Sequence, residues 1–531
     1  MNRAPTVPQV WTRYDALLYN LMSMNPAVML ILPFLTAAAY YIGGSFIAAI
    51  ALCGAFCCAE ALVYAFLASS MPRSGGDYYY QTRLLSGTVG SVFGFACFVL
   101  GGTIWMAIAC WLAANVAVGP ALVILGQLGH IPSLIALGTS VQSGGGMFLL
   151  SLFVIGWAAY INLKSPRTYL RLQRVLWIVG AAAVLAPLIM LLASSPRSLG
   201  DSPPFVAAAA ESARLGFSQN RVGVTFGATL ALVPVAAFWL IYPCWSVYHV
   251  GEMREAGRLR HQVLTMVGAE AITIAISMAV VWVVTSRFGG ERLAAAAYLF
   301  VNDRAHMPFP TLPIFWFADG HLWPAGVAAL CLAVFFNALF WMWVPDIPLA
   351  ASRVMAAMST GRRLPRWLGE LSGPHQVPAT AVFVFSLMCL VPVAVFAYTG
   401  LWRLSMVETM LNGMAFAVTC AVAATLPYLR RETYRRSTAA PHELFRVPVI
   451  TLCGVAFVGF AGFVFWRFAV DDGLVLGQQR LVAWSIFVGL YAVSLALTLS
   501  FQLFLRRRET LEVEVVYRRV VHKPESTRPN G

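Results

Sequence analysis

Long apolar stretches restrict the fold of this sequence more than any other feature. Of its 531 residues, 60% are hydrophobic and 11% are charged, whereas a soluble domain carries about 25% charged residues. A bilayer core of about 30 Å needs about 20 apolar residues per helix. Twelve stretches meet this need, near residues 14–36, 40–68, 88–118, 146–163, 172–193, 223–248, 263–285, 321–358, 378–398, 405–428, 447–469 and 481–505. They are too long for barrel strands and do not alternate, so the sequence predicts an all-α membrane protein with twelve transmembrane helices.

Lysine and arginine fall mainly on one predicted side of the membrane. With twelve spans both termini share a side, and 27 of the 36 Lys and Arg residues lie on it. Because basic loops stay in the cytoplasm, we expect a multi-pass protein of the cytoplasmic (inner or plasma) membrane with both termini cytoplasmic. The first stretch follows Arg13 directly and is a full span long, so no cleavable signal peptide is expected. The net charge of +14 thus reflects topology, and no nucleic-acid partner is expected.

Prolines interrupt the first and sixth apolar stretches. Pro26 and Pro243 each remove a backbone donor and free carbonyls of the preceding turn. Secondary transporters bind substrates at interrupted helices that occupy corresponding positions in two inverted repeats. A simple proline kink explains these two residues equally well. The substrate-site interpretation predicts the following contacts: Ser23, Met24, Asn25, Ala27, Phe238, Ile241, Tyr242 and Asp346.

With Asp15 and Glu408, at the ends of their stretches, counted as loop residues, three acidic residues lie inside the apolar stretches: Glu60, Glu270 and Asp346. Each costs about 2.5–3.5 kcal/mol at a lipid-facing helix centre, so each should face protein or water. Asp346 stands between Pro345 and Pro348, and we interpret it as a carboxylate that exchanges a proton or faces a cation. The alternative is an acid satisfied by the backbone that the prolines free. Glu60 is the second candidate for a coupling group.

Two loop motifs resemble those of amino acid–polyamine–organocation superfamily permeases. The first is Val63–Tyr80, with Pro72-Arg73-Ser74-Gly75-Gly76-Asp77 at its centre. The second is Ala351–Gly361, which contains Arg353 and precedes Leu364-Pro365. Gly251–Glu255 after the sixth stretch is a weaker match. Together with twelve spans and cytoplasmic termini, the resemblance covers nearly the whole chain.

The resemblance implies a five-plus-five inverted repeat (the LeuT-like fold) with discontinuous first and sixth spans around the substrate. It divides the chain into a cytoplasmic tail (1–13), a ten-helix transport core (14–430), two additional helices (431–505) and a second cytoplasmic tail (506–531). It also assigns residues to a cytoplasmic gate, in which we expect Arg73 to pair with Asp77. The assigned gate residues are Arg73, Gly75, Gly76, Asp77 and Arg353.

The implied function is secondary active transport of an amino acid or related amine by alternating access, coupled to protons or to exchange. The sequence departs from the family pattern at two places in the substrate site. The break at 23–27 contains no glycine, and Gly180 stands where some relatives have a lysine that serves in ion coupling. A transport-incompetent sensor or assembly subunit therefore stays an alternative, and a polytopic membrane enzyme is a weaker one. Histidines are scattered, cysteines lie in the apolar stretches, and no phosphate-binding loop is present, so we predict no enzyme activity, cofactor or metal.

Overall fold

A computed structural model describes residues 9–35, 43–217, 224–303, 306–318, 323–399, 401, 405–470 and 479–508. Helices make up nearly all of this part, with one short hairpin near the carboxyl terminus. The elements are α1 (Arg13–Ser23), α2 (Pro26–Leu35), α4 (Phe46–Ser70), α5 (Gly76–Leu84), α6 (Gly87–Phe93), η1 (Gly94–Leu100), α7 (Gly101–Leu112), η2 (Ala113–Val118), α8 (Gly119–Leu128), α9 (Pro132–Val141), α10 (Gly144–Leu163), α11 (Pro166–Ala193), α12 (Pro203–Arg214), α13 (Phe226–Ala231), α14 (Val233–Leu240), η3 (Trp245–Glu252), α15 (Leu259–Phe288), α16 (Gly290–Asn302), η5 (Pro313–Ala318), α17 (Trp323–Trp343), α18 (Asp346–Thr360), η6 (Arg366–Leu368), α19 (Ala379–Tyr398), α20 (Met406–Leu429), α21 (Arg431–Arg435), β1 (Glu443–Leu444), β2 (Val447–Pro448), α22 (Val449–Ala469) and α23 (Arg480–Arg508).

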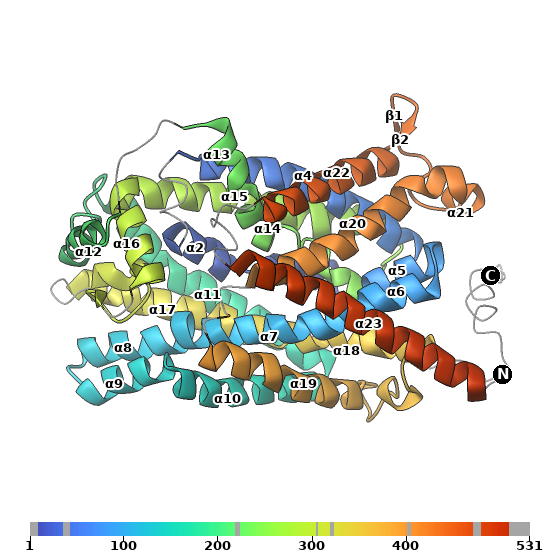
Figure 1. Ribbon diagram of the computed structural model, residues 1–531, viewed down its shortest axis with the longest axis horizontal. Helices are drawn as coiled ribbons and strands as arrows, with labels where there is room; N and C mark the ends of the chain where they lie inside the picture. Colours follow the sequence, from blue (N-terminus) through green and yellow to red (C-terminus); the bar gives the residue numbers. More distant parts are fainter. Residues whose placement is uncertain are drawn as a thin grey trace, which may run out of the picture.

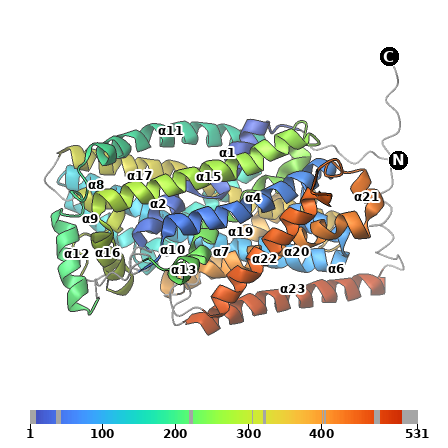
Figure 2. The ribbon, with the colours of Figure 1, turned by 90° about the horizontal axis from the view of Figure 1, so that it is seen from above.

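The long helices run side by side along the longest axis of the molecule (Figure 1). Short elements lie at the two ends of this bundle. We call the end with α5, α21 and the β1–β2 hairpin the α21 end, and the end with α12 and α16 the α12 end (Figures 1 and 2). This arrangement places long apolar helices between two polar caps.

Eleven helical segments in the described part are long and apolar enough to cross a membrane, and we conclude that the chain is a multi-pass membrane protein. Their positions agree with eleven of the predicted stretches to within a few residues at most ends. The third stretch is longer than predicted, because helix continues from Gly87 to Leu128. The last helix also runs through the arginines at 506–508, which we had placed in the tail; residues 1–8 and 509–531 of the predicted tails lie outside the described residues.

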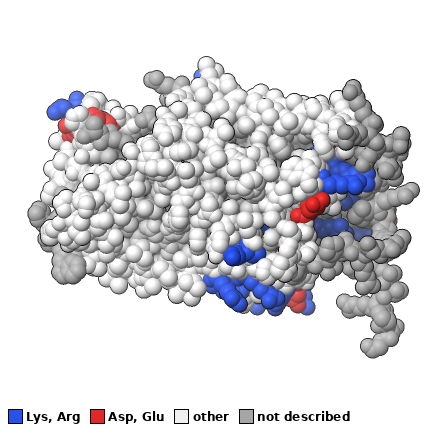
Figure 3. All heavy atoms as spheres, turned by 90° about the horizontal axis from the view of Figure 1, so that it is seen from below, with Lys and Arg blue, Asp and Glu red and all other residues white. Residues whose placement is uncertain are grey.

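The surface of the bundle has the character of a lipid-facing one. Of the most apolar 18-residue stretch of α11, only 11% is buried inside the protein. The corresponding stretch of the segment Phe226–Glu252 is 89% buried, so this segment lies in the centre of the bundle. Large apolar side chains such as Ile178, Ile189 and Phe383 are well over half exposed. On the face seen in Figure 3, a small charged group lies at one end of the long axis, most other charged side chains lie in the opposite half, and the surface between them is largely uncharged.

The first predicted span is two short helices, α1 and α2, separated by Met24 and Asn25. The third span is continuous but contains two π-helical segments, η1 and η2. Such wide turns leave irregular backbone hydrogen bonding inside an otherwise regular helix. The bundle core is therefore built partly from interrupted or distorted helices.

Two glycines of α22 offer a matched test of how that helix packs on α20. A Cβ on Gly454 would lie 2.6 Å from the carbonyl oxygen of Cys420, whereas a Cβ on Gly459 would have nothing within 4 Å. We expect Gly454→Ala to destabilise the protein by about 1–3 kcal/mol through overpacking. Gly459→Ala should leave stability unchanged or slightly raised, because alanine favours helix. Thermal unfolding of the purified protein in detergent measures both; equal effects would contradict this packing.

Candidate functional site

The break between α1 and α2 is set by two residues. Asn25 adopts a left-handed conformation (φ 49°), which asparagine tolerates better than most residues. Pro26 begins α2, where its missing N–H costs nothing. The Asn25 side-chain oxygen accepts hydrogen bonds from the backbone N–H groups of Ala27 (3.2 Å) and Val28 (3.4 Å). This side chain therefore caps α2.

The sixth span is interrupted between α14 and η3. Helix α14 ends at Leu240, and the chain passes through Ile241–Cys244 before the 3₁₀ helix η3 begins. Asn20 of α1 holds the start of η3, because its Oδ1 accepts from the Ser246 N–H (2.8 Å) and its Nδ2 donates to the Ser246 hydroxyl (3.1 Å). The same Nδ2 donates to the Thr265 carbonyl of α15 (2.7 Å). Helix α1 of the first span is thus fixed to η3 of the sixth.

A third interruption separates α17 from α18, and Asp346 is the first residue of α18. A carboxylate at this position interacts favourably with the positive end of the helix dipole. The carbonyl of Pro345 accepts from the Leu349 N–H (3.2 Å) and also from Nδ2 of Asn162 in α10 (2.8 Å). Asp346 is 1% exposed, its Oδ2 accepts from the Ser23 hydroxyl (3.3 Å), and its Oδ1 has no partner among the described residues. One carboxylate oxygen is therefore left for another ligand.

A narrow cavity lies beside Asp346 at the meeting point of these three interruptions. The space left among the lining side chains, ≈ 10 Å³, is about what one water molecule needs. Four of the lining side chains are aromatic, so rings form much of the wall of the cavity. The lining residues are Ser23, Trp105, Tyr242, Trp245, Trp343, Asp346 and Ile347.

Trp105 and Phe238 separate this cavity from a second, apolar pocket. The ring centroids of Trp105 and Phe238 are 5.7 Å apart, and Trp105 also contacts Tyr242 and Trp343 at 5.4 and 5.6 Å. Phe238 lines the second pocket, which has a volume of ≈ 90 Å³ and includes Ile31, Trp111 and Met406. The two spaces lie on either side of one aromatic layer.

The structure brings together only some of the predicted substrate contacts. Ser23, Tyr242 and Asp346 line the cavity, and Phe238 lies in the aromatic layer. Met24, Asn25, Ala27 and Ile241 are buried but do not line it. We expected Asn25 to offer a hydrogen bond to the substrate; its side-chain oxygen is instead engaged by α2.

A line of buried polar side chains leads from the cavity along α1, η3 and α18. Tyr19, one turn before Ser23, shares a hydrogen bond of 2.9 Å with Nε2 of His249. His249 Nδ1 lies 4.0 Å from Glu252, which accepts from Nε of Arg353 (2.9 Å). All four side chains are less than a tenth exposed. Arg353, assigned to the gate from its motif, thus neutralises a carboxylate at the end of η3.

The glycine-rich turn before α5 is also attached to η3. Gly75 and Gly76 have positive φ angles of 117° and 50°, and Gly76 packs so tightly on the Tyr248 ring that a Cβ would overlap it. The Gly75 N–H donates to the Tyr248 carbonyl (3.3 Å), and the Gly251 N–H donates to the Ser74 hydroxyl (3.2 Å). The motif therefore positions η3, the second half of the sixth span.

The expected pairing of Arg73 with Asp77 is wrong. Arg73 is exposed, whereas Asp77 is fully buried at the start of α5. The Asp77 carboxylate accepts from three hydroxyls, those of Tyr64, Tyr248 and Thr419. Three fixed donors from α4, η3 and α20 satisfy the acid without desolvating an arginine side chain.

Glu60 lies away from the cavity, in the contact between α4 and α15. It is fully buried and accepts a weak hydrogen bond from the Cys244 thiol (3.6 Å). Glu270 of α15 is buried in the same contact, and a Cβ on Gly54 would lie 3.6 Å from its Oε1. Glu60 and Glu270, the other two acids predicted inside the membrane, thus share one helix–helix interface.

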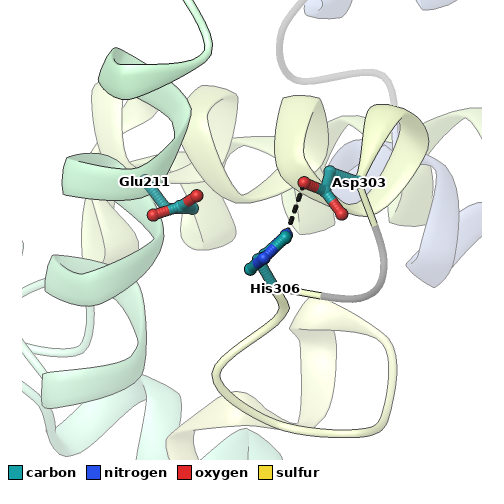
Figure 4. Close-up of side chains that lie close together, drawn as sticks. All are labelled: Glu211, Asp303 and His306. Atoms are coloured by element: carbon teal, nitrogen blue, oxygen red, sulfur yellow. Dashed lines mark hydrogen bonds and ion pairs between the residues drawn. The ribbon is translucent and has the colours of Figure 1, made fainter.

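At the α12 end, Glu211, Asp303 and His306 lie close together (Figure 4). The sequence pointed to no metal ligands, and spacing alone would not have joined these residues. His306 Nδ1 lies 2.7 Å from an Asp303 oxygen, and Arg214 lies 3.2 Å from a Glu211 oxygen. Because these contacts already pair the charges on a partly exposed surface, we assign no metal ion to the group.

Sequence reasoning missed several members of the site. Tyr19 could have been found, since it lies four residues before Ser23 on the same helical face. Glu408, buried in the first turn of α20, lies within the tenth apolar stretch but was counted as a loop residue. Trp343 carries no signal in the sequence, because its place in the cavity depends on the break before Asp346.

No protein-family model and no curated protein matches this sequence.

The buried Glu252–Arg353 pair can be tested by its stability. We expect Glu252→Gln to lower the free energy of unfolding by about 3–5 kcal/mol, because it leaves the Arg353 guanidinium buried without a counter-charge. The matched control is Glu255→Gln, which breaks the exposed Glu255–Arg258 pair (3.0 Å) and should cost about 1 kcal/mol or less. Thermal unfolding distinguishes them, and a Glu252→Gln variant as stable as the control would contradict a buried ion pair.

Proposed function

We propose that this protein is a secondary active transporter that moves an amino acid or related amine across the membrane by alternating access. The observation that carries the proposal is the position of Asp346: a buried carboxylate with one free oxygen, at a cavity where three interrupted helices meet. Transporters use such interruptions because free helix ends and unwound backbone can bind a polar solute within the bilayer.

The proposed fold is the five-plus-five inverted repeat of the amino acid–polyamine–organocation superfamily, with twelve spans. The α1–α2 pair adds the first span to the eleven long helical segments and brings the number of spans to twelve, since Arg13–Leu35 is as long as a membrane-spanning helix. In such a repeat the first span corresponds to the sixth and the third to the eighth. Interruptions at 24–25 and 241–244 support the first relation. Distortions in η1 and before Asp346 support the second.

The lining of the cavity favours a substrate with an ammonium group. Asp346 provides one negative charge, and Trp105, Trp245 and Trp343 provide aromatic faces, which attract cations. Ser23 and Tyr242 add neutral hydroxyls. We assign the coupling role to a proton or to a second substrate molecule in exchange, with Asp346 as the titrating carboxylate.

The proposed orientation places the α21 end in the cytoplasm. Arginines of the 430–436 segment, of the 362–366 segment and of the loop before α15 lie in the connections at this end. Basic connections are retained on the cytoplasmic side. The Glu252–Arg353 pair and the Asp77 hydrogen bonds would then close the inner side of the cavity.

Uptake into proteoliposomes tests the proposed function. We expect accumulation of at least one labelled amino acid or amine, increased by an inward proton gradient or by the same solute inside. A substrate that raises the unfolding temperature without any flux would favour the sensor alternative. Absence of both flux and stabilisation across amino acids and amines would overturn the proposal.

Asp346→Asn tests the assigned charged group in the same assay. We expect transport to fall by at least ~100-fold, because loss of a charge–charge contact in a buried site costs about 3 kcal/mol or more. Glu291→Gln, at an exposed acid on α16, is the control and should transport normally. Transport retained by Asp346→Asn from pH 5 to pH 8 would remove Asp346 from the site.

A further inference from the structure

A second carboxylate centre lies in the core, on the first turns of α20. Glu408 and Asn412 are one helical turn apart and share a face. Tyr242, from the interruption in the sixth span, lies against Thr409 and Asn412. All four side chains are at most 2% exposed. None of the predicted coupling groups belongs to this cluster.

The cluster has more oxygens than its own donors satisfy. Asn412 Nδ2 donates to the Glu408 backbone carbonyl (3.1 Å) and also to the Glu408 carboxylate. Four oxygens make no hydrogen bond of good geometry among the described residues, although the Tyr242 hydroxyl lies close to Thr409 and Asn412: Glu408 Oε2, Thr409 Oγ1, Asn412 Oδ1 and the Tyr242 hydroxyl. Each such buried atom costs about 1–3 kcal/mol, and a carboxylate more. A ligand that accepts oxygen lone pairs would recover this energy.

The chemistry of the four oxygens restricts the ligand. Hard cations prefer carboxylate, amide and hydroxyl oxygens. Glu408 supplies a single negative charge, which a monovalent cation neutralises, whereas a divalent cation would leave a net charge in the apolar core. A proton would neutralise Glu408 but leave the Asn412, Thr409 and Tyr242 oxygens unbound.

The space around Glu408 favours a small ligand. A Cβ on Gly101 of α7 would lie 2.7 and 3.1 Å from the two Glu408 carboxylate oxygens. The carboxylate is therefore covered by the α7 backbone, and the cavity lined by Asp346 does not include Glu408. A single ion fits the narrow space between the Glu408 carboxylate and the α7 backbone better than an amine with its carbon substituents.

We propose that Glu408, Thr409, Asn412 and Tyr242 bind a monovalent cation of the size of sodium. Tyr242 belongs to both centres, because its side chain also lines the cavity beside Asp346. Binding of the cation fixes the Tyr242 side chain and so links the ion to the substrate cavity, a coupling that acts in both directions. This linkage rests on the proposed transport function; cation binding itself does not.

Thermal unfolding of the full-length protein in detergent tests the site without any substrate. At constant ionic strength and pH, we expect the unfolding temperature to rise with NaCl concentration when NaCl replaces choline chloride, as ligand linkage requires. Glu408→Gln, which keeps the shape and removes the charge, should abolish the rise. Thr409→Val should weaken the apparent sodium affinity by at least ~10-fold. Asp346→Asn, altered at the other carboxylate, should keep the full rise.

Three results would overturn the proposal. The first is an unfolding temperature of the unaltered protein that does not rise with sodium. The second is a rise that is unchanged in both Glu408→Gln and Thr409→Val. The third is a rise that is lost in Asp346→Asn but kept in Glu408→Gln. Stabilisation by acid but not by sodium would assign a proton to Glu408 instead. A sodium response together with failure of every uptake experiment would leave the cation site standing and remove the transport function.

Discussion

Every polar atom within the apolar bundle needs a partner from the protein or from a ligand, because lipid offers none. This requirement explains why interruptions of the helices coincide with polar side chains. Asn25 caps the helix that begins after it, Asn20 binds the start of η3, and Asn162 binds the Pro345 carbonyl just before Asp346. Each break is therefore a fixed part of the structure. The buried oxygens that keep no hydrogen-bond partner among the described residues include those of Asp346 and of the Glu408 cluster, where a ligand gains free energy by binding.

The same requirement separates the buried charges into two kinds. Glu252 is paired with an arginine and Asp77 accepts from hydroxyls, both at the α21 end of the bundle, and their contacts join η3 to α18, α4 and α20. Asp346 and Glu408 accept only from neutral groups, and each keeps one carboxylate oxygen without a partner among the described residues. The first kind holds elements together. The second kind can still bind a ligand, and Asp346 and Glu408 are connected through Tyr242.

Sequence reasoning predicted the positions of the long helices because hydropathy adds up over about 20 residues and tolerates local error. It also located the breaks at Pro26 and Pro243, since proline acts on its own backbone. Side-chain partners could not be predicted in this way. Asp77 seemed to need Arg73 until the hydroxyls of Tyr64, Tyr248 and Thr419, distant in sequence, were placed around it. Glu408 was missed because the end of an apolar stretch is defined only to within a few residues.

The two halves of the first span share some neighbours and differ in others. Both pack on α15 and α17, but α1 also packs on η3 and α11, whereas α2 also packs on α16 and η5. Only Met24 and Asn25 join these halves, so a tilt of one half is not transmitted rigidly to the other. In the proposed transport cycle, α1 would shift with η3 and α11 while α2 keeps its contacts with α16 and η5. Access to the centre from one end of the bundle would change in this way while the opposite end stays closed.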